Sequence, residues 1–416
     1  MRSYGQVQAL SDLGCDVKVL SCADQGFEMN HDFDYHSLKN VIFKKVKNSS
    51  EQFVNIDLSK NSYRARIKKI ILRLFPKFFL RIIFLFRTLI FLCRDDPKWT
   101  RKVLHDYKKD LGDWSPNLIF STCSPVDSHI IASKISRDLS IPWVGEFRDC
   151  WSYNTMLFST SENELSARIL RAIERKILSN CSVIFAAGPS VQSYYARHFS
   201  KETQLLLGGW EERNSEIIGK FLQKANTEDT KKKYEKKKKI KVLHLGSMLH
   251  GTRSILPIIQ MLDLEPLLKE RYEFEFVGRD SKIFQSVLDE SPANNAIKLF
   301  DHVTFNEAEK LGYSADILLI LMKDSPMEKY TLTGKIFEYI KFSKPIISFD
   351  PYDSEVSKLI KKFNLGYHVK SINEFQLLLK SKTNLSDFAK ADNHTRLEFQ
   401  RSVQIKKVLK RLKDFA

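Results

Sequence analysis

A loop, a helix and a strand in the C-terminal half carry residue types that suit an anion-binding site. Thr333 and Gly334 lie in the loop, Lys335 opens the helix and Glu338 follows one turn later. Ligands of open α/β sheets bind beyond the carboxyl ends of the strands, where helix N-termini offer N–H groups. Thr333 and Gly334 are therefore candidates to bind a phosphate, and Glu338 to accept hydrogen bonds from ribose hydroxyls. Spacing alone leaves an alternative open, in which Thr333 only caps the helix and Glu338 is an exposed acid.

A second candidate group follows the strand predicted at residues 241–245. Gly246 lets the backbone approach a pyrophosphate, Ser247 follows it, and Arg253 comes after a short loop. A guanidinium can bind phosphate oxygens with two N–H groups, and Lys335 offers a second cation. Without a metal ion, such cations must neutralise the charge of a leaving phosphate. Taken alone, either base is more often simply solvated.

The N-terminal half has polar residues after two predicted strands. Ser124 follows the strand at 118–121, and Arg148 with Asp149 follows the strand at 143–146. An Arg–Asp pair can orient the hydroxyl groups of a ligand, although a purely structural pair is equally consistent with the sequence. Strand alternation puts Glu146 on the opposite face, where a structural role is expected.

Other polar residues are interpreted as structural or solvated. Two histidines near loop ends are expected to pack or face water, and five charged residues are expected to form an exposed helical face. These are His129 and His250, and Arg168, Arg171, Glu174, Arg175 and Lys176.

Strand-like apolar runs alternate with helical stretches along almost the whole chain, which is typical of doubly wound parallel sheets. The first series of predicted strands covers residues 17–20, 41–46, 118–121, 143–146, 183–186 and 205–207. The second series covers residues 241–245, 274–277, 297–300, 317–321 and 345–349, and helices from Asn373 and His394 close the chain. The pattern predicts an α/β protein with two Rossmann-like doubly wound domains.

The two series of strands define the expected domains. Gly208, Gly209 and the lysine blocks at 231–233 and 236–239 indicate a linker. We therefore expect an N-terminal domain at 1–207, a Lys-rich linker at 208–240, a C-terminal domain at 241–392 and a C-terminal helix at 393–416. The chain opens on a helix where such a sheet normally opens on a strand, so the first strand of the N-terminal domain is expected to be missing.

Residues 66–93 depart from the alternation of strands and helices. On a helical projection, most bases of this segment fall within an arc of roughly 120°, and Ile, Leu and Phe fill the rest. A core helix with a basic edge is one explanation. The wide spread of Phe residues favours an amphipathic helix on an anionic membrane surface.

Composition limits the class of protein. A chain of 416 residues fits two domains, and 43% apolar residues are typical of a folded protein. The net charge of +17 favours partners such as anionic lipid, nucleic acid or phosphorylated ligands. The six cysteines show no C-x-x-C or zinc-type spacing, and no secretory signal is recognised. Reduced thiols and a cytoplasmic location are therefore expected.

Two motifs resemble the family 4 glycosyltransferases. The run TGKIFEYIKFSKPII at 333–347 is similar to the donor-site motif of that family, and GEFRDCW at 145–151 is similar to its FRDLW stretch. The resemblance implies the GT-B fold of two facing Rossmann-like domains, a nucleotide diphosphate-sugar donor, retention of anomeric configuration and no metal. Glu338 matches the ribose-binding second glutamate of the motif, whereas the first falls at Tyr330.

The resemblance also implies roles for the other candidate residues. The family commonly has Arg or Lys directly after the strand at 241–245, where this chain has Ser247, so the role of phosphate-binding cation moves to Arg253. The expected catalytic groups are Arg253, Lys335 and Asp149. Donor binding is assigned to Gly246, Ser247, Arg253, Thr333, Gly334, Lys335 and Glu338, and acceptor binding to Ser124, Arg148 and Asp149.

The sequence thus predicts a glycosyltransferase of surface-polysaccharide biosynthesis that acts on a lipid-linked glycan. It is expected to use no cofactor besides its nucleotide-sugar co-substrate, to bind no nucleic acid, and to lie on the inner face of the cytoplasmic membrane. Two alternatives remain open: a nucleotide-sugar epimerase or a phosphorylase on the same fold, and a non-catalytic protein that binds membrane surfaces or nucleic acid. The Lys-rich stretch favours the second, although no nucleic-acid-binding module accompanies it.

Overall fold

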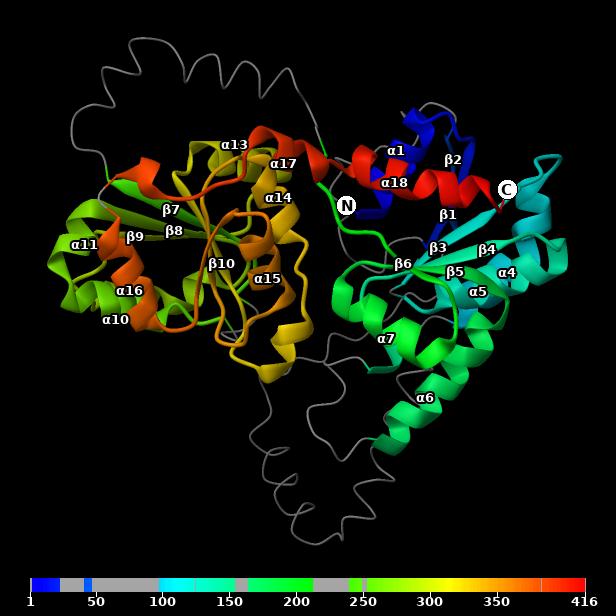
Figure 1. Cartoon of the computed structure of the whole chain (residues 1–416), viewed down its shortest axis with the longest axis horizontal. Coiled ribbons are helices and arrows are strands. Elements are labelled where there is room, and N and C mark those ends of the chain that lie inside the picture. The colour runs from blue at the N-terminus through cyan, green and yellow to red at the C-terminus, as the bar shows by residue number, and fades with distance from the viewer. Residues whose placement is uncertain are drawn as a thin grey trace, which may run out of the picture. The chain divides into compact units, whose positions relative to one another are not determined.

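The structure is a computed structural model that describes residues 2–22, 41–46, 97–123, 125–153, 164–211, 239–248, 253–382 and 384–415 (Figure 1). The chain divides into two compact units, Met1–Leu207 with Lys406–Ala416 as unit 1 and Gly208–Ile405 as unit 2. Both units are α/β with parallel sheets, so the predicted fold class is confirmed. The amphipathic segment at 66–93, most of the Lys-rich stretch, Ser124 and His250 lie outside the described residues.

Unit 1 contains two parallel sheets among its described strands. β1 (Val17–Cys22) pairs with β2 (Val41–Val46), and a separate sheet has the order β3-β4-β5-β6. The strands of the larger sheet are β3 (Ile119–Cys123), β4 (Trp143–Phe147), β5 (Cys181–Ala186) and β6 (Thr203–Leu205). The helices are α1 (Arg2–Asp12), α4 (Pro97–Leu111), α5 (Asp127–Leu139), α6 (Glu164–Ile177), α7 (Pro189–Phe199) and the short helices η3 (Trp151–Tyr153) and η5 (Leu178–Asn180).

Aromatic packing holds the larger sheet of unit 1 against its helices. The rings of Phe147 on β4 and Tyr195 on α7 lie 4.2 Å apart between centroids, and both side chains are buried. All five residues of β4 are buried, which is expected of a central strand covered on both faces. The loop after β4 therefore leaves the sheet from a rigid position.

Unit 2 is built on a six-stranded parallel sheet of order β12-β11-β10-β7-β8-β9. The strands are β7 (Ile240–Leu245), β8 (Tyr272–Val277), β9 (Ile297–Phe300), β10 (Ile317–Leu321), β11 (Ile346–Phe349) and β12 (Gly366–Val369). The helices are α10 (Leu256–Leu264), α11 (Pro266–Arg271), α12 (Gln285–Asp289), α13 (Phe305–Ser314), α14 (Lys335–Lys341), α15 (Glu355–Lys362), α16 (Ile372–Ser381) and α17 (Asn393–Glu398), with the short helices η6 (Ser281–Phe284), η7 (Pro326–Tyr330) and η8 (Leu385–Asp387). The strand order reverses at β7, since β8 and β10 flank it on either side.

Helices cover both faces of the unit 2 sheet (Figure 1). Side chains of α10 and α16, such as Ile258 and Phe375, pack in one cluster with Val242 and Phe274. Successive side chains of a strand point to opposite faces. Leu243 and Leu318 are therefore directed to the other face, where α13 contacts β7 and α14 contacts β10. Near-continuous apolar runs such as ILLIL in β10 follow from burial on both faces.

Most predicted strands coincide with observed ones, and the differences fall near the ends of the series. The last predicted strand of the first series, 205–207, lies two residues further along the chain than β6. β12 was not predicted from the sequence, because it is short and has only Val369 buried. Residues 393–416 contain two helices instead of one, α17 and α18 (Arg401–Lys413), and the boundary between the units lies within α18.

A short segment next to Gly209 pairs with the chain between α17 and α18. The N–H of Trp210 donates to Phe399 O at 3.1 Å, and the N–H of Arg401 donates to Trp210 O at 2.9 Å. A Cβ on Gly209 would lie 2.7 Å from the Cα of Arg401, so only glycine permits this approach. The buried Arg401 also pairs with Glu211 at 2.6 Å. The chain crosses the boundary between the units next to Gly208 and again within α18. These hydrogen bonds therefore connect, within unit 2, the two segments that lie near the crossings.

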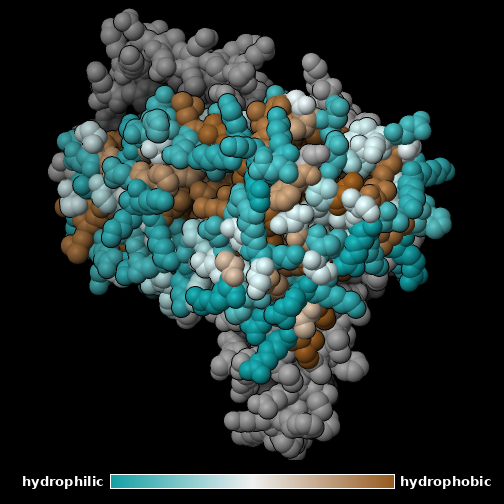
Figure 2. Space-filling model, turned by 45° about the vertical axis from the view of Figure 1, so that its right-hand side comes forward, coloured by the Kyte–Doolittle hydropathy of each residue, from teal (hydrophilic) through white to brown (hydrophobic). Residues whose placement is uncertain are grey.

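On the face that Figure 2 shows, hydrophilic side chains cover most of the described surface, and hydrophobic ones gather in smaller patches. Within the described residues, the helices are too short or too polar to span a bilayer.

Candidate functional site

The carboxyl end of β7 is the topological switch point of unit 2, and doubly wound sheets bind their ligands at such points. Gly246 follows β7 with a φ of +143°, a backbone conformation that residues with a side chain rarely adopt. Its N–H donates to Val277 O at 2.8 Å, which fixes the turn against β8. The chain after β7 is thereby held close to the sheet edge.

The side chain of Lys335, the first residue of α14, lies across Gly246. A Cβ at position 246 would fall 1.8 Å from Lys335 Nζ and 2.2 Å from its Cε. Burial and the neighbouring charge of Arg253 lower the pKa of Lys335 to about 7. Within the described part of the chain, no hydrogen bond or ion pair is found for Lys335 Nζ. The structure therefore brings together Gly246 and Lys335, which are 89 positions apart in the sequence.

We expect Gly246→Ala to displace Lys335 and to strain the turn, because its Cβ would occupy the place of the ammonium. Strain of a residue forced into this backbone region costs on the order of 1–3 kcal/mol. Gly14→Ala is the matched control, since Gly14 also has a positive φ, +83°, but a Cβ added there would have no atom within 4 Å. Both variants should lower the melting temperature of the protein. Only Gly246→Ala should also reduce its stabilisation by a nucleotide diphosphate, and equal binding by both variants would contradict a role for Lys335.

Arg253 is held beside the same turn. Its side-chain Nη1 donates to Ser247 O at 3.2 Å, and its backbone N–H donates to Met248 O at 3.3 Å. Its Nε is buried and has no hydrogen-bond partner among the described residues. Burial lowers the pKa of Arg253, whereas the carboxylate of Glu328 opposes that shift. The loop thus holds a partly desolvated guanidinium beside Gly246, and its Nε–H bonds nothing among the described residues.

Glu328, on η7, is a residue of this site that the sequence analysis missed. It is nearly buried, and burial raises its pKa against the opposing charges of Lys323 and Arg253. Its Oε2 is buried without a hydrogen-bond partner among the described residues. Tyr330, where the family motif has its first glutamate, is 44% exposed. The sequence did offer one indication of this residue: an acid stands two positions before Tyr330, in the loop that follows β10, the strand next to β7.

α14 is anchored to the sheet and to α13. The hydroxyl of Tyr339 accepts a hydrogen bond from the N–H of Leu245 at 2.8 Å and donates to Leu319 O at 3.3 Å. At the other end of the helix, buried Lys341 forms an ion pair with buried Glu309 of α13. These contacts fix the position of α14 and therefore of Lys335.

The other candidates around α14 lie at its start. Glu338 and Thr333 are partly exposed, and Gly334 is exposed. The N-cap is Gly334, without any side-chain cap, so Thr333 does not cap the helix as the alternative interpretation supposed. Gly334 has a φ of −61°, and a Cβ added there would have no atom within 4 Å, so other residues would fit. The structure thus gathers Gly246, Ser247, Arg253, Lys335 and Glu328 around the end of β7, with Thr333, Gly334 and Glu338 at the start of the adjoining helix.

In unit 1, Arg148 and Asp149 follow β4 and are both exposed. Arg148 Nε donates to Cys123 O at 3.0 Å, which joins the ends of β3 and β4. Glu146 is buried and accepts a hydrogen bond from Gln6 Nε2 at 2.8 Å, as expected of a structural residue.

The histidine of this unit that follows β3 is a packing residue. His129 is buried against Phe147 with ring centroids 4.3 Å apart. Burial lowers its pKa to about 3, so it stays neutral at physiological pH.

The interpretation of Glu174 as an exposed acid is wrong, because its side chain is only 1% exposed. Ser152 Oγ donates to Glu174 Oε2, and Tyr195 Oη donates to its Oε1 at 2.5 Å. Tyr195 Oη in turn accepts the N–H of Trp151 at 3.2 Å. Burial raises the pKa of Glu174 to about 7. This buried network holds the turn that follows Asp149. The burial of Glu174 was not predicted because its charged neighbours on the same helix made the whole stretch resemble an exposed face.

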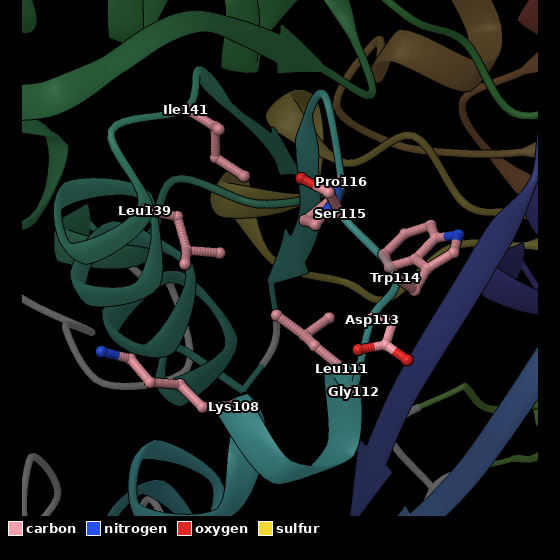
Figure 3. Close-up of a pocket in the computed structure, with 9 residues that line it drawn as sticks. All are labelled: Lys108, Leu111, Gly112, Asp113, Trp114, Ser115, Pro116, Leu139 and Ile141. Carbon is pink, nitrogen blue, oxygen red and sulfur yellow. The ribbon is translucent and has the colours of Figure 1, made fainter.

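A separate cavity of about 270 Å³ lies at the opposite, amino-terminal edge of the unit 1 sheet (Figure 3). Leu111, Leu139 and Ile141 line it, with Trp114 and Asp113 toward β1. None of the candidate residues lines this cavity.

The fold is similar to that of GT-B glycosyltransferases of known structure. No protein-family model matches the sequence, and no curated protein matches it significantly. Solved structures with this fold include sucrose-phosphate synthase from Thermosynechococcus elongatus (10% identity, 99% of this chain and 92% of that chain, TM-score 0.62) and Anabaena Alr3699/HepE in complex with UDP (12%, 76% and 82%, TM-score 0.52). WaaG, a glycosyltransferase involved in lipopolysaccharide biosynthesis, is also similar (12%, 98% and 91%, TM-score 0.50). At these identities the likeness establishes the GT-B glycosyltransferase fold.

Proposed function

We propose that the protein is a glycosyltransferase that moves a sugar from a nucleotide diphosphate-sugar to a glycan acceptor. The observation that carries the proposal is the convergence of Lys335 and Arg253 at the end of β7, at the switch point of the sheet. Two cations that bond no carboxylate among the described residues suit the diphosphate of such a donor, because they neutralise the charge that develops on the leaving group. The GT-B fold and the UDP bound to the Anabaena protein support this class of donor.

Each remaining candidate has a place in this proposal. Gly246 and Ser247 let the backbone approach the diphosphate, with Thr333 and Gly334 beside it, and Glu338 accepts the ribose hydroxyls. Ser124, Arg148 and Asp149 of unit 1 bind the acceptor, and Asp149 acts nearest to the transferred sugar.

We further propose family 4 chemistry, with retention of configuration and neither a metal ion nor another cofactor. Positioning and charge neutralisation then suffice, without a covalent intermediate. The described residues hold no cluster of three metal-ligating side chains. The anomeric form of the product, read by proton NMR before mutarotation, tests retention, and activity in excess EDTA tests metal independence.

The proposed acceptor is a lipid-linked glycan of surface-polysaccharide assembly, reached at the inner face of the cytoplasmic membrane. Support comes from the basic and apolar residues at 66–93, the net charge of +17 and the lipopolysaccharide role of WaaG. Nucleic acid is not a proposed partner.

The donor site is tested by a thermal-shift titration with UDP, GDP, dTDP and ADP. A ligand that binds only the folded state at 100 times its Kd raises the melting temperature by about 5–10 °C for a domain of this size. We expect one nucleotide to stabilise the protein and Glu338→Ala to lose most of that shift. Lys361→Met, an exposed residue of α15, is the control and should keep it. If no nucleotide stabilises the folded protein, the proposal is wrong, and an epimerised donor formed without acceptor would favour the epimerase alternative.

A further inference from the structure

Lys335 and Arg253 form a pair of adjacent cations in a partly desolvated site. Lys335 Nζ lies against Gly246, and the guanidinium of Arg253 is fixed to the backbone of the same turn. Two like charges near each other in a desolvated site disfavour the charged state of the one that can lose a proton, which is lysine. An arginine stays charged in proteins.

The other titratable groups near this pair do not counteract the repulsion between the two positive charges. From β7, His244 is buried, and its pKa lies well below the ordinary value, so it contributes no charge of either sign. Glu328 of η7 interacts with Arg253, but its charge is not among the influences on Lys335. Lys323 and Asp350, after β10 and β11, act on Glu328. Glu338, on the same helix as Lys335, is likewise not among those influences.

We propose that this site binds its nucleotide diphosphate together with one proton, which Lys335 Nζ takes up. The inference rests on the proposed function, since it assigns the diphosphate to this site. In the empty site, Lys335 is half deprotonated at about pH 7 because of burial and Arg253. An anionic diphosphate favours the ammonium form and raises its pKa, so binding above pH 7 requires proton uptake.

The direction of the pH dependence follows from this linkage. Below about pH 7, Lys335 is protonated with or without ligand, and affinity is independent of its ionisation. Above pH 7, the empty site loses the proton and the occupied site keeps it, so affinity falls as pH rises. The expected loss is about tenfold per pH unit until the pKa of the occupied site is reached.

The experiment is isothermal titration calorimetry of the full chain with UDP, or with GDP, dTDP or ADP if one of these stabilises the protein more. Titrations at pH 8 in HEPES and in Tris, which differ in ionisation enthalpy and carry no phosphate that could compete for the site, give the number of protons taken up. The nucleotide's own phosphate contributes little there, because its second pKa is about 6. We expect between about half a proton and one proton per bound nucleotide for the native protein at this pH.

Lys335→Arg is the matched variant, because arginine keeps the charge and cannot be deprotonated. It should bind the nucleotide without proton uptake, and with an affinity that does not fall between pH 7 and pH 9. Lys335→Met should bind weakly at every pH, which shows that the cation contacts the ligand. Nucleotide binding by the native protein without proton uptake overturns the inference and leaves the proposed function standing. No binding of any nucleotide overturns both.

Discussion

Replacement of Arg253 by methionine is expected to lower kcat/KM about 10²- to 10³-fold, the usual effect of removing one group that stabilises developing charge. The reason is geometric. Arg253 Nη1 donates to Ser247 O, which holds the guanidinium beside Gly246, and its buried Nε has no hydrogen-bond partner among the described residues. In a desolvated site such a contact strengthens as negative charge develops on the leaving diphosphate.

The assay for this variant is hydrolysis of the nucleotide sugar in the absence of acceptor, which avoids the need to know the acceptor. We expect the loss mainly in kcat, because the interaction strengthens in the transition state. Arg253→Lys should recover part of the activity, since lysine keeps the charge but not the two-pronged geometry. Lys361→Met removes an exposed base of α15 and serves as the control for a general change of charge. An Arg253→Met protein that is folded and as active as the control would rule out the assigned role.

Replacement of Lys341 by methionine is expected to destabilise unit 2 by about 3–5 kcal/mol, because it leaves the charge of Glu309 buried and unpaired. Both side chains are almost fully buried, at 1% and 3% exposure. The same surface of α13 packs against the ring of Phe342, where a Cβ on Gly312 would fall 2.3 Å from the ring. This close packing opposes a rearrangement of the helices that would expose the acid to water.

The measurement is thermal unfolding followed by fluorescence and calorimetry, with the transition of each unit assigned separately, since a two-domain chain need not unfold in one step. The double variant Glu309→Leu/Lys341→Met should recover most of the loss, because apolar pairs often replace buried ion pairs without cost. Lys282→Met breaks the exposed pair with Asp301, whose atoms lie 2.6 Å apart, and should cost less than about 1 kcal/mol. If Lys341→Met costs no more than Lys282→Met, the buried pair does not hold α14 in place.

The stability prediction bears on activity through the position of α14. Lys341 anchors the end of the helix that begins with Lys335, and Tyr339 ties its middle to Leu245 beside Gly246. A loosened α14 should therefore lower nucleotide affinity even in protein that remains folded at the assay temperature. Glu309→Leu/Lys341→Met should restore affinity and stability together.

The sequence determined the local structure of this protein to a large extent. Strands such as β5 and β10 are buried on both faces, so their residues form nearly continuous apolar runs whose ends are marked by polar residues. Gly246 and Arg253 were recognised because glycine at a strand end and a base in the next loop are the residue types that a diphosphate requires. The short strand β12 was not predicted, because only one of its side chains is buried and a periodic apolar pattern arises only where side chains are buried.

Only the tertiary structure decided which of these residues meet and which charges are buried. The contact of Lys335 with Gly246 depends on the packing of α14 beside β7, which no spacing in the chain encodes. Glu174 and Lys341 have the residue types of exposed helical positions, yet the packing of neighbouring helices buries both. A charged residue is buried when a specific partner offsets its desolvation, and that partner comes from another element. Residue patterns therefore predicted the elements and the kind of site, whereas the electrostatics of that site arose from contacts between elements far apart in the sequence.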